Sequence, residues 1–247
     1  MRRSHENGFT LLELMAVMAF ITIISASIFL LLNTAVQRYQ AESQTLDSFQ
    51  TARLAIDQMT RDIHGAGFPP ANIGWKFLAS QPTALPFAWD PGYVASTSCA
   101  VGVNCTTPST TDLIIEGNIS PTTGSGVQWI RYTLSGTTLM RGVVSKTIGT
   151  DPASATSASG VMFSYVDNVI NSAQGVPVFT YECSNNSTPP NPMPCTDASV
   201  APPYNTAPYI RQVGITLIVQ SAQPDPKTGQ FQTVSLHSQT VVLNPNQ

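Results

Sequence analysis

The stretch ENGFTLLELMAVMAFITIISASIFLLL, residues 6–32, decides the fold of this chain. Within it, residues 9–32 carry a single charge, on Glu13, among apolar and small side chains. A helix of this length rises about 36 Å, which is enough to cross a hydrocarbon core of about 30 Å. A secretory signal peptide has a shorter apolar run, of about 7–15 residues, and a small-residue cleavage site that is not evident here. We therefore expect a membrane-spanning helix.

The residues before this helix set its orientation. Arg2 and Arg3 lie in the leader MRRSHENG, and basic residues beside a membrane helix tend to stay on the cytoplasmic side. The rest of the 247-residue chain, long enough for one sizeable domain, is then expected on the other side of the membrane.

The helical pattern continues beyond the apolar run. Apolar side chains recur there at spacings of three and four residues, which predicts one stripe of an amphipathic helix: Leu46, Phe49, Ala52, Ile56, Met59 and Ile63. Proline is absent from residues 9–68, and Gly65, Gly67 and the pair Pro69-Pro70 then supply a stop. One helix from Phe9 to about His64 is the expectation.

Glu13 is unusual in such a helix. A carboxylate costs about 2.5–3.5 kcal/mol at the bilayer centre and less near an end, so Glu13 could simply reach the headgroups. Alternatively, cleavage between Gly8 and Phe9 would create a cationic amine four residues before Glu13, and that amine on a neighbouring subunit could neutralise it. Such a pair is worth up to about 4 kcal/mol before desolvation losses.

The leader ending in Gly8, followed by FTLLELM and the long apolar helix, resembles the N-terminus of type IV prepilins and type II secretion pseudopilins. The resemblance implies cleavage after Gly8 by a prepilin peptidase, N-methylation of Phe9 and a docking role for Glu13 in assembly. It also implies other pilins and the inner membrane assembly machinery as partners. The implied location is a single-pass inner membrane protein with its C-terminal domain outside the cytoplasm, and then the pilus or cell surface.

The segment DIHGAGF at the expected helix end, residues 62–68, is similar to the corresponding segment of PilW-type minor pilins. That resemblance implies a minor pilin that helps to initiate or prime pilus assembly. Pseudopilin J of type II secretion systems has a similar layout and is the alternative.

Strand patterns follow the helix. LIIEG, a hairpin around Ser135-Gly136, VMFSYVD, VPVFTYEC and two longer strands near the end alternate at period two. The prediction is an α+β, type IV pilin-like fold in which a long helix packs on an antiparallel β-sheet. The expected parts are a leader (1–8), an assembly helix (9–32), its amphipathic continuation (33–64), a loop-rich connection (65–111) and the sheet domain (112–247). An insertion loop is expected at residues 168–174, and residues 185–208 are expected to be exposed.

The four cysteines favour disulfides. Cys99 and Cys105 are close in sequence, as are Cys183 and Cys195, and neither pair has a nearby histidine or zinc-motif spacing. Two local disulfides in an oxidising compartment are the favoured interpretation, although four cysteines allow three connectivities.

Composition and motifs argue against catalysis. Only 10% of residues are charged, the net charge is −3, and no basic block suggests a phosphate-binding footprint. Metalloprotease, serine hydrolase and phosphate-loop motifs are absent from the sequence, and His5, His64 and His237 are far apart. We expect no enzyme, no metal and no cofactor. The PDPKTG segment with Asp225 and Lys227 predicts a turn rather than a calcium site.

A binding role remains as a further alternative. Loops near Cys99 and Cys183 could contact a surface or DNA, as in a tip adhesion or DNA-uptake module, with an unknown ligand. The aromatic residues of the connecting region are expected to cover the core instead of forming a ligand platform: Trp75, Phe77, Phe87, Trp89 and Tyr93.

Overall fold

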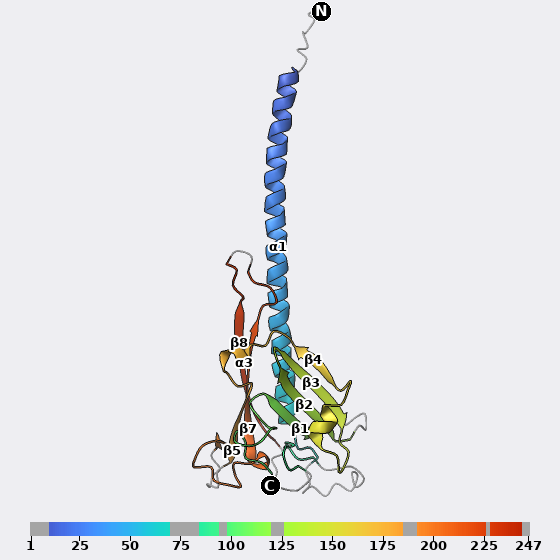
Figure 1. The fold of residues 1–247 in the computed structure, drawn as a ribbon, viewed down its shortest axis with the longest axis vertical. Helices are drawn as coiled ribbons and strands as arrows, with labels where there is room; N and C mark the ends of the chain where they lie inside the picture. The colour runs from blue at the N-terminus through green and yellow to red at the C-terminus, as the bar shows by residue number, and fades with distance from the viewer. Residues whose placement is uncertain are drawn as a thin grey trace, which may run out of the picture.

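A long helix dominates the computed structural model, which describes residues 10–69, 84–93, 98–119, 126–184, 192–225 and 228–243. Helix α1 (Leu11–His64) projects far beyond the head domain, so that its N-terminal half stands alone (Figure 1). The predicted continuous helix is confirmed. Several residues named above lie outside the described residues: Arg2, Arg3, His5, Gly8, Phe9, Pro70, Trp75, Phe77 and Lys227.

The strands form two antiparallel sheets. The first sheet has the order β1 (Asp112–Gly117), β2 (Gln128–Ser135), β3 (Thr138–Ser145) and β4 (Met162–Val166). The second has the order β6 (Pro192–Pro194), β5 (Phe179–Ser184), β7 (Ile210–Gln220) and β8 (Thr233–Val241). The α+β prediction is confirmed, with the strands divided between two sheets.

The chain between β4 and β5 links the two sheets. This segment, expected as an insertion loop, contains the short helix α3 (Asn171–Gln174) and a single bridge between Val169 and Val219 of β7. The side chain of Asn171 bonds to the backbone of Thr216 and Ile218 in β7. The segment therefore lies along the part of β7 that extends beyond its pairing with β5. Two further short helices are α2 (Pro152–Thr156) and η3 (Ala207–Tyr209).

The hairpin predicted at Ser135-Gly136 is present. Ser135 pairs with Thr138, and Gly136 adopts a positive φ of 61°, which a residue with a Cβ adopts only with strain. The pairing of β2 and β3 continues without interruption to Gln128 and Ser145. Ile130, Tyr132 and Leu139 from these strands contribute to the large hydrophobic core that includes α1, and Trp129 belongs to a second, smaller cluster.

The buried face of α1 differs from the predicted stripe. Ala52, Ile56, Met59 and Ile63 are buried as predicted, but Leu46 is 59% exposed and Phe49 only half-buried. The prediction for Leu46 was wrong because the sheets end below it. In the described part of the chain, the β7–β8 hairpin reaches the helix at this level, on the face that carries Thr45.

Helix α1 ends on the first strand of the sheet. Gly65 caps the helix, and Gly67 has φ of 79° and donates its N–H to the Glu116 carbonyl at 2.7 Å. A Cβ on Gly117 would lie 3.3 Å from the Gly65 carbonyl oxygen. Small residues on both sides thus permit the close backbone approach that fixes the helix end on β1.

A buried carboxylate joins α1 to the first sheet. Asp62, 5% exposed, accepts hydrogen bonds from the Tyr132 hydroxyl at 2.5 Å and from Arg141 Nη2 at 2.8 Å. Gln58 Nε2 donates to its other oxygen at 2.6 Å, and the Arg141 guanidinium lies over the Tyr132 ring. Because the carboxylate is paired and hydrogen-bonded, its burial is tolerated, and the contact fixes how the helix sits on β2 and β3.

The Asp62 contact predicts a large effect on stability. Asp62→Ala would leave Arg141 and Tyr132 without their acceptor, and breaking a buried pair costs about 3–5 kcal/mol. We expect thermal unfolding of the full chain in detergent to show a clear loss of stability. Asp57→Ala, at an exposed position of the same helix, is the control and should change the midpoint little. Equal midpoints for the two variants would contradict the role given to Asp62.

The exposed N-terminal helix as candidate assembly site

Glu13 lies in the first turn of α1. Thr10 caps the helix, and its hydroxyl accepts a hydrogen bond from the Glu13 N–H at 3.3 Å. The pattern Thr-x-x-Glu at a helix start is a capping box, which the sequence interpretation did not use. The helix dipole also favours a carboxylate in the first turn. Gly8 and Phe9, the predicted processing residues, lie outside the described residues.

The apolar half of α1 is not covered by any part of the chain that the structure describes. Large apolar side chains from Leu11 to Leu32 are 45–81% exposed, and this helix is long and apolar enough to cross a membrane. Full burial of one such side chain is worth about 1.5–3 kcal/mol relative to water. The helix must therefore lie in lipid or against other apolar helices.

Hydroxyl groups in this half bond to their own helix. Thr22 donates to the Ala19 carbonyl, Ser27 to the Ile23 carbonyl and Thr34 to the Leu30 carbonyl, at 2.8–2.9 Å. A hydroxyl that bonds within its helix needs no water, so these residues are compatible with a hydrocarbon environment.

The cysteines form two disulfides. Cys99 is bonded to Cys105 and Cys183 to Cys195, so both pairs are local, and none of the four cysteines is free. Cys99, Cys183 and Cys195 are buried, so the bonds form part of the core at the β5–β6 side of the domain. The two loops meet where a Cβ on Gly102 would lie 2.6 Å from the Thr196 side chain.

A second buried carboxylate was missed in the sequence. Glu116, fully buried in β1, accepts hydrogen bonds from Trp129 Nε1 at 2.8 Å and from the Leu85 N–H at 2.9 Å, and also from the Tyr93 hydroxyl. Lys146 Nζ lies 2.7 Å from it. A single acid in a short strand gives no sequence signal of its partners, which come from distant segments. The expectation that Phe87, Trp89 and Tyr93 cover the core agrees with their burial.

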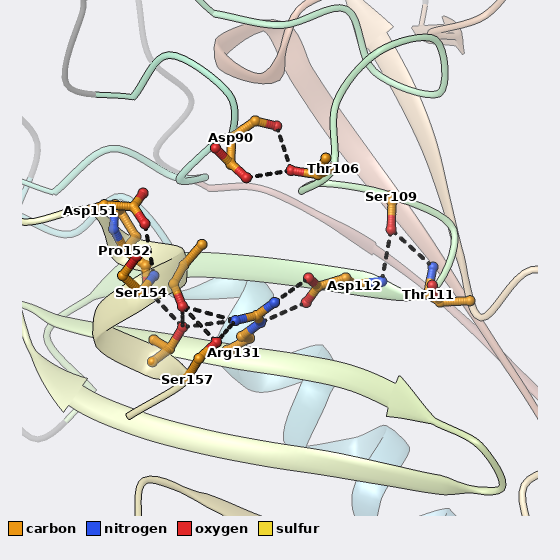
Figure 2. A network of polar contacts seen from close by, with 12 residues as sticks. Asp90, Thr106, Ser109, Thr111, Asp112, Arg131, Asp151, Pro152, Ser154 and Ser157 are labelled. Atoms are coloured by element: carbon orange, nitrogen blue, oxygen red, sulfur yellow. Dashed lines mark hydrogen bonds and ion pairs between the residues drawn. The ribbon is translucent and has the colours of Figure 1, made fainter. Parts of the chain in front are cut away.

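A third polar network fixes the short helix α2 on the first sheet (Figure 2). The Arg131 guanidinium forms two bonds with the Asp112 carboxylate, at 2.9 and 2.6 Å, and donates to the Ala153 carbonyl at 3.0 Å. Hydrogen bonding to Asp112 raises the pKa of Arg131. Asp151 caps α2 through the Ser154 N–H. The network satisfies its own charges and leaves no group poised for chemistry.

The two histidines that the structure describes, His64 and His237, make separate contacts. His64 contacts the Val241 carbonyl oxygen and His237 contacts the Thr216 hydroxyl, on different strands. Across the ranges that the structure describes, no three histidine, cysteine, aspartate or glutamate side chains are grouped so as to hold a metal ion.

A family model matches the start of the chain. The prokaryotic N-terminal methylation motif covers residues 3–29, which include Gly8, Phe9 and Glu13. A search of curated proteins finds no match to the chain. From Leu11 on, the matched residues lie in the exposed apolar half of α1.

The fold and this motif together support a type IV pilin-like protein. The motif indicates the pilin or pseudopilin class, whose members are structural subunits. It implies processing by a prepilin peptidase and assembly with other pilins, and the apolar helix fits anchoring in a membrane through the N-terminus.

Two buried tyrosines predict how the stability depends on pH. Burial, with the nearby charges of Asp62 and Glu116, raises the pKa of Tyr132 and of Tyr93 well above the ordinary value. A phenol whose pKa is raised in the folded state stabilises the fold fully below its unfolded pKa of about 10, and this contribution is lost as the pH rises beyond it. The free energy of unfolding should therefore fall above about pH 10.

Phenolate absorbance during alkaline titration of the full chain provides the measurement. The part of the phenolate absorbance that comes from Tyr132 and Tyr93 should rise only when the protein unfolds. Tyr132→Phe should remove the contribution of Tyr132 to the fall in the free energy of unfolding with pH. Reversible ionisation of all tyrosines near pH 10 with the fold intact would contradict the burial of these groups.

Proposed function

We propose that the chain is a minor pilin of a type IV pilus, PilW-like, that helps to initiate or prime pilus assembly. One observation carries the proposal: an acid lies in the first turn of an apolar helix that the described residues of the chain leave uncovered, within a prepilin-type motif. The segment DIHGAGF at the end of the same helix supports the minor pilin assignment by resemblance.

The proposed mechanism exchanges lipid for protein. Before assembly, the apolar half of α1 lies in the inner membrane, with the head domain outside the cytoplasm. During assembly the same side chains pack against the helices of neighbouring subunits, where close packing and polar pairing replace contacts with lipid. Cleavage after Gly8 frees the amine of Phe9, and N-methylation leaves that amine cationic.

Glu13 selects the axial position of a neighbour in this proposal. Its carboxylate is exposed in the isolated chain, so it is available to the Phe9 amine of an adjacent subunit. A charge pair at about 4 Å in a medium of effective dielectric near 20 is worth up to about 4 kcal/mol before desolvation. An error in axial position would leave both charges buried without a partner, which penalises incorrect insertion.

Two alternatives rest on specific features. A J-like pseudopilin of a type II secretion system would use the same apolar N-terminal helix in the same way. Neighbouring genes for secretion components would favour this alternative. A tip-binding module is favoured by a pocket of about 280 Å³ between the two disulfide loops, lined in part by Val101, Tyr181 and Pro194. Its ligand is unknown. Deletion of residues 185–194 that abolishes adhesion or DNA uptake while pili still assemble would support this module.

Glu13→Ala tests the proposed function. The variant should fold normally, because Glu13 lies far from the head domain, but its amount in sheared surface filaments should fall at least about tenfold, as expected for loss of about 1.4 kcal/mol or more. Immunoblots of the sheared and membrane fractions provide the measurement. Glu42→Ala, at an exposed acid farther along the same helix, is the matched control.

Recovery of the Glu13→Ala variant in filaments at the level of the Glu42→Ala control would contradict the pairing role of Glu13. Absence of the native chain itself from every sheared filament preparation would contradict the pilus assignment.

A further inference from the structure

Among the described strands, β8 forms one edge of the second sheet. It stands at the end of the strand order, and its nine residues pair with β7 without a register shift. Monomeric proteins protect such edges with charged residues, prolines, bulges or short strands. The sequence TVSLHSQTV has none of these features, and its only titratable side chain is that of His237. A long, regular and uncharged edge of this kind is suited to pairing with another strand.

The backbone groups at this edge can be assigned. Just beyond the two ends of β8, the Val242 N–H donates to the Arg211 carbonyl at 2.9 Å and the Gln232 carbonyl accepts from the Ser221 N–H at 2.8 Å. The backbone N–H and C=O groups of the even-numbered residues of β8 therefore point toward β7. Because this direction alternates along a strand, the backbone groups of the odd-numbered residues point away from β7, to the free edge. At the C-terminal end of β8, His64 contacts the Val241 carbonyl oxygen. The outward N–H and C=O groups of the odd-numbered residues from Thr233 to Gln239 are left for a partner strand.

The direction of β8 restricts which strand can pair with it. Gln232 lines a pocket with Glu42 of α1, and Val241 contacts His64 at the end of α1, so β8 runs parallel to the helix. Two copies anchored in one membrane have parallel helices, so their β8 strands run the same way. An antiparallel pair of two β8 strands would require the helices to point in opposite directions.

Strand β4 has the opposite direction. Phe163 of β4 pairs with Arg141, which bonds to Asp62 near the end of α1. A few residues later the chain reaches Val169, which pairs with Val219 at the membrane side of β7. Strand β4 therefore runs toward the membrane, antiparallel to α1 and β8.

Strand β4 is also an edge strand. It ends the order of the first sheet, its sequence MFSYV carries no charge, and Phe163 is 65% exposed. The strand is short and its pairing with β3 shifts register between Leu139 and Met140, so the regular edge that it offers is Met162–Ser164. Strands β8 and β4 lie on opposite sides of α1 (Figure 1). One copy thus presents two complementary edges, one running with the helix and one against it, on its two flanks.

We propose that β8 of one copy pairs antiparallel with β4 of a second copy of this chain, so that adjacent head domains share a continuous sheet while their helices stay parallel. The contact is head-to-tail, which permits a row or helical arrangement instead of a closed pair. It provides the exposed Phe163 with cross-strand neighbours on the polar outer face of β8. The proposal rests on the proposed function, because parallel helices follow from shared anchoring or assembly.

Cross-linking in membranes tests the pairing. The native chain has no free cysteine, so Gln239→Cys in one tagged copy and Ser164→Cys in a differently tagged copy introduce the only reactive thiols. A short bismaleimide should give a mixed dimer at least about tenfold more abundant than the dimers from Gln239→Cys copies alone or Ser164→Cys copies alone. These two homotypic mixtures have the same membrane density and serve as matched controls. A mixed dimer no more abundant than the homotypic ones overturns the proposal.

A second variant tests the backbone contact. Ser235→Pro, added to the Gln239→Cys copy, removes an outward N–H, and proline is tolerated on an edge strand. The mixed dimer should fall at least about fivefold, while Ser235→Ala, which keeps the N–H, should leave it unchanged. Thermal unfolding verifies that both variants fold. Unchanged cross-linking in a folded Ser235→Pro variant overturns the pairing through the β8 edge.

The sheared-filament fraction separates this inference from the proposed function. Copies recovered in filaments without a mixed cross-link overturn the β8–β4 contact alone. A mixed cross-link that depends on Ser235 supports the contact, even if the copies are absent from filaments and the pilus assignment fails.

Discussion

The whole structure depends on the solvation of one helix surface. The first half of α1 exposes large apolar side chains around its entire circumference, and the described chain has nothing with which to cover them. Water is excluded as a stable environment for this surface because each side chain would forfeit about 1.5–3 kcal/mol of burial. The apolar half of α1 therefore requires lipid before assembly and the helices of other subunits within an assembly.

The second half of α1 fixes the head domain relative to the apolar half of the helix. Ala52, Met59 and Ile63 bury one face of the helix in the core, and Asp62 bonds to Tyr132 and Arg141 across the first sheet. A purely apolar contact would permit sliding and rotation of the helix, whereas a buried carboxylate with defined donors favours one arrangement. A head domain held in this way keeps the same orientation relative to its neighbours whenever the helices pack.

The sequence predicts the parts governed by periodicity and fails where distant segments meet. The helix from the apolar run to Gly65, the hairpin at Gly136 and the α+β class follow from local patterns. The division of the strands between two sheets is not encoded in the periodicity of any one strand, since each strand alternates in the same way in either arrangement. Leu46 belongs to the predicted helical stripe, but it is exposed because the sheets do not extend along the helix as far as Leu46. The helix periodicity does not predict where the sheets end.

The candidate site shows the same contrast. Glu13 is evident in the sequence because a charge in an apolar run is unusual, and the methylation motif spans it. The burial of Glu116 could not be predicted from the sequence because its bonding partners, Tyr93, Trp129 and Lys146, lie on other segments. The thiol pairs were foreseeable from short spacing, although the contact between the two disulfide loops was not.

Mass spectrometry of intact chains from purified surface filaments tests the central claim most directly. The account predicts a chain that begins at N-methylated Phe9 and that accompanies other pilin-like subunits in the filament. A chain that still begins at Met1, found only in the membrane and absent from every filament preparation, would contradict the view that this helix is built to exchange lipid for neighbouring helices.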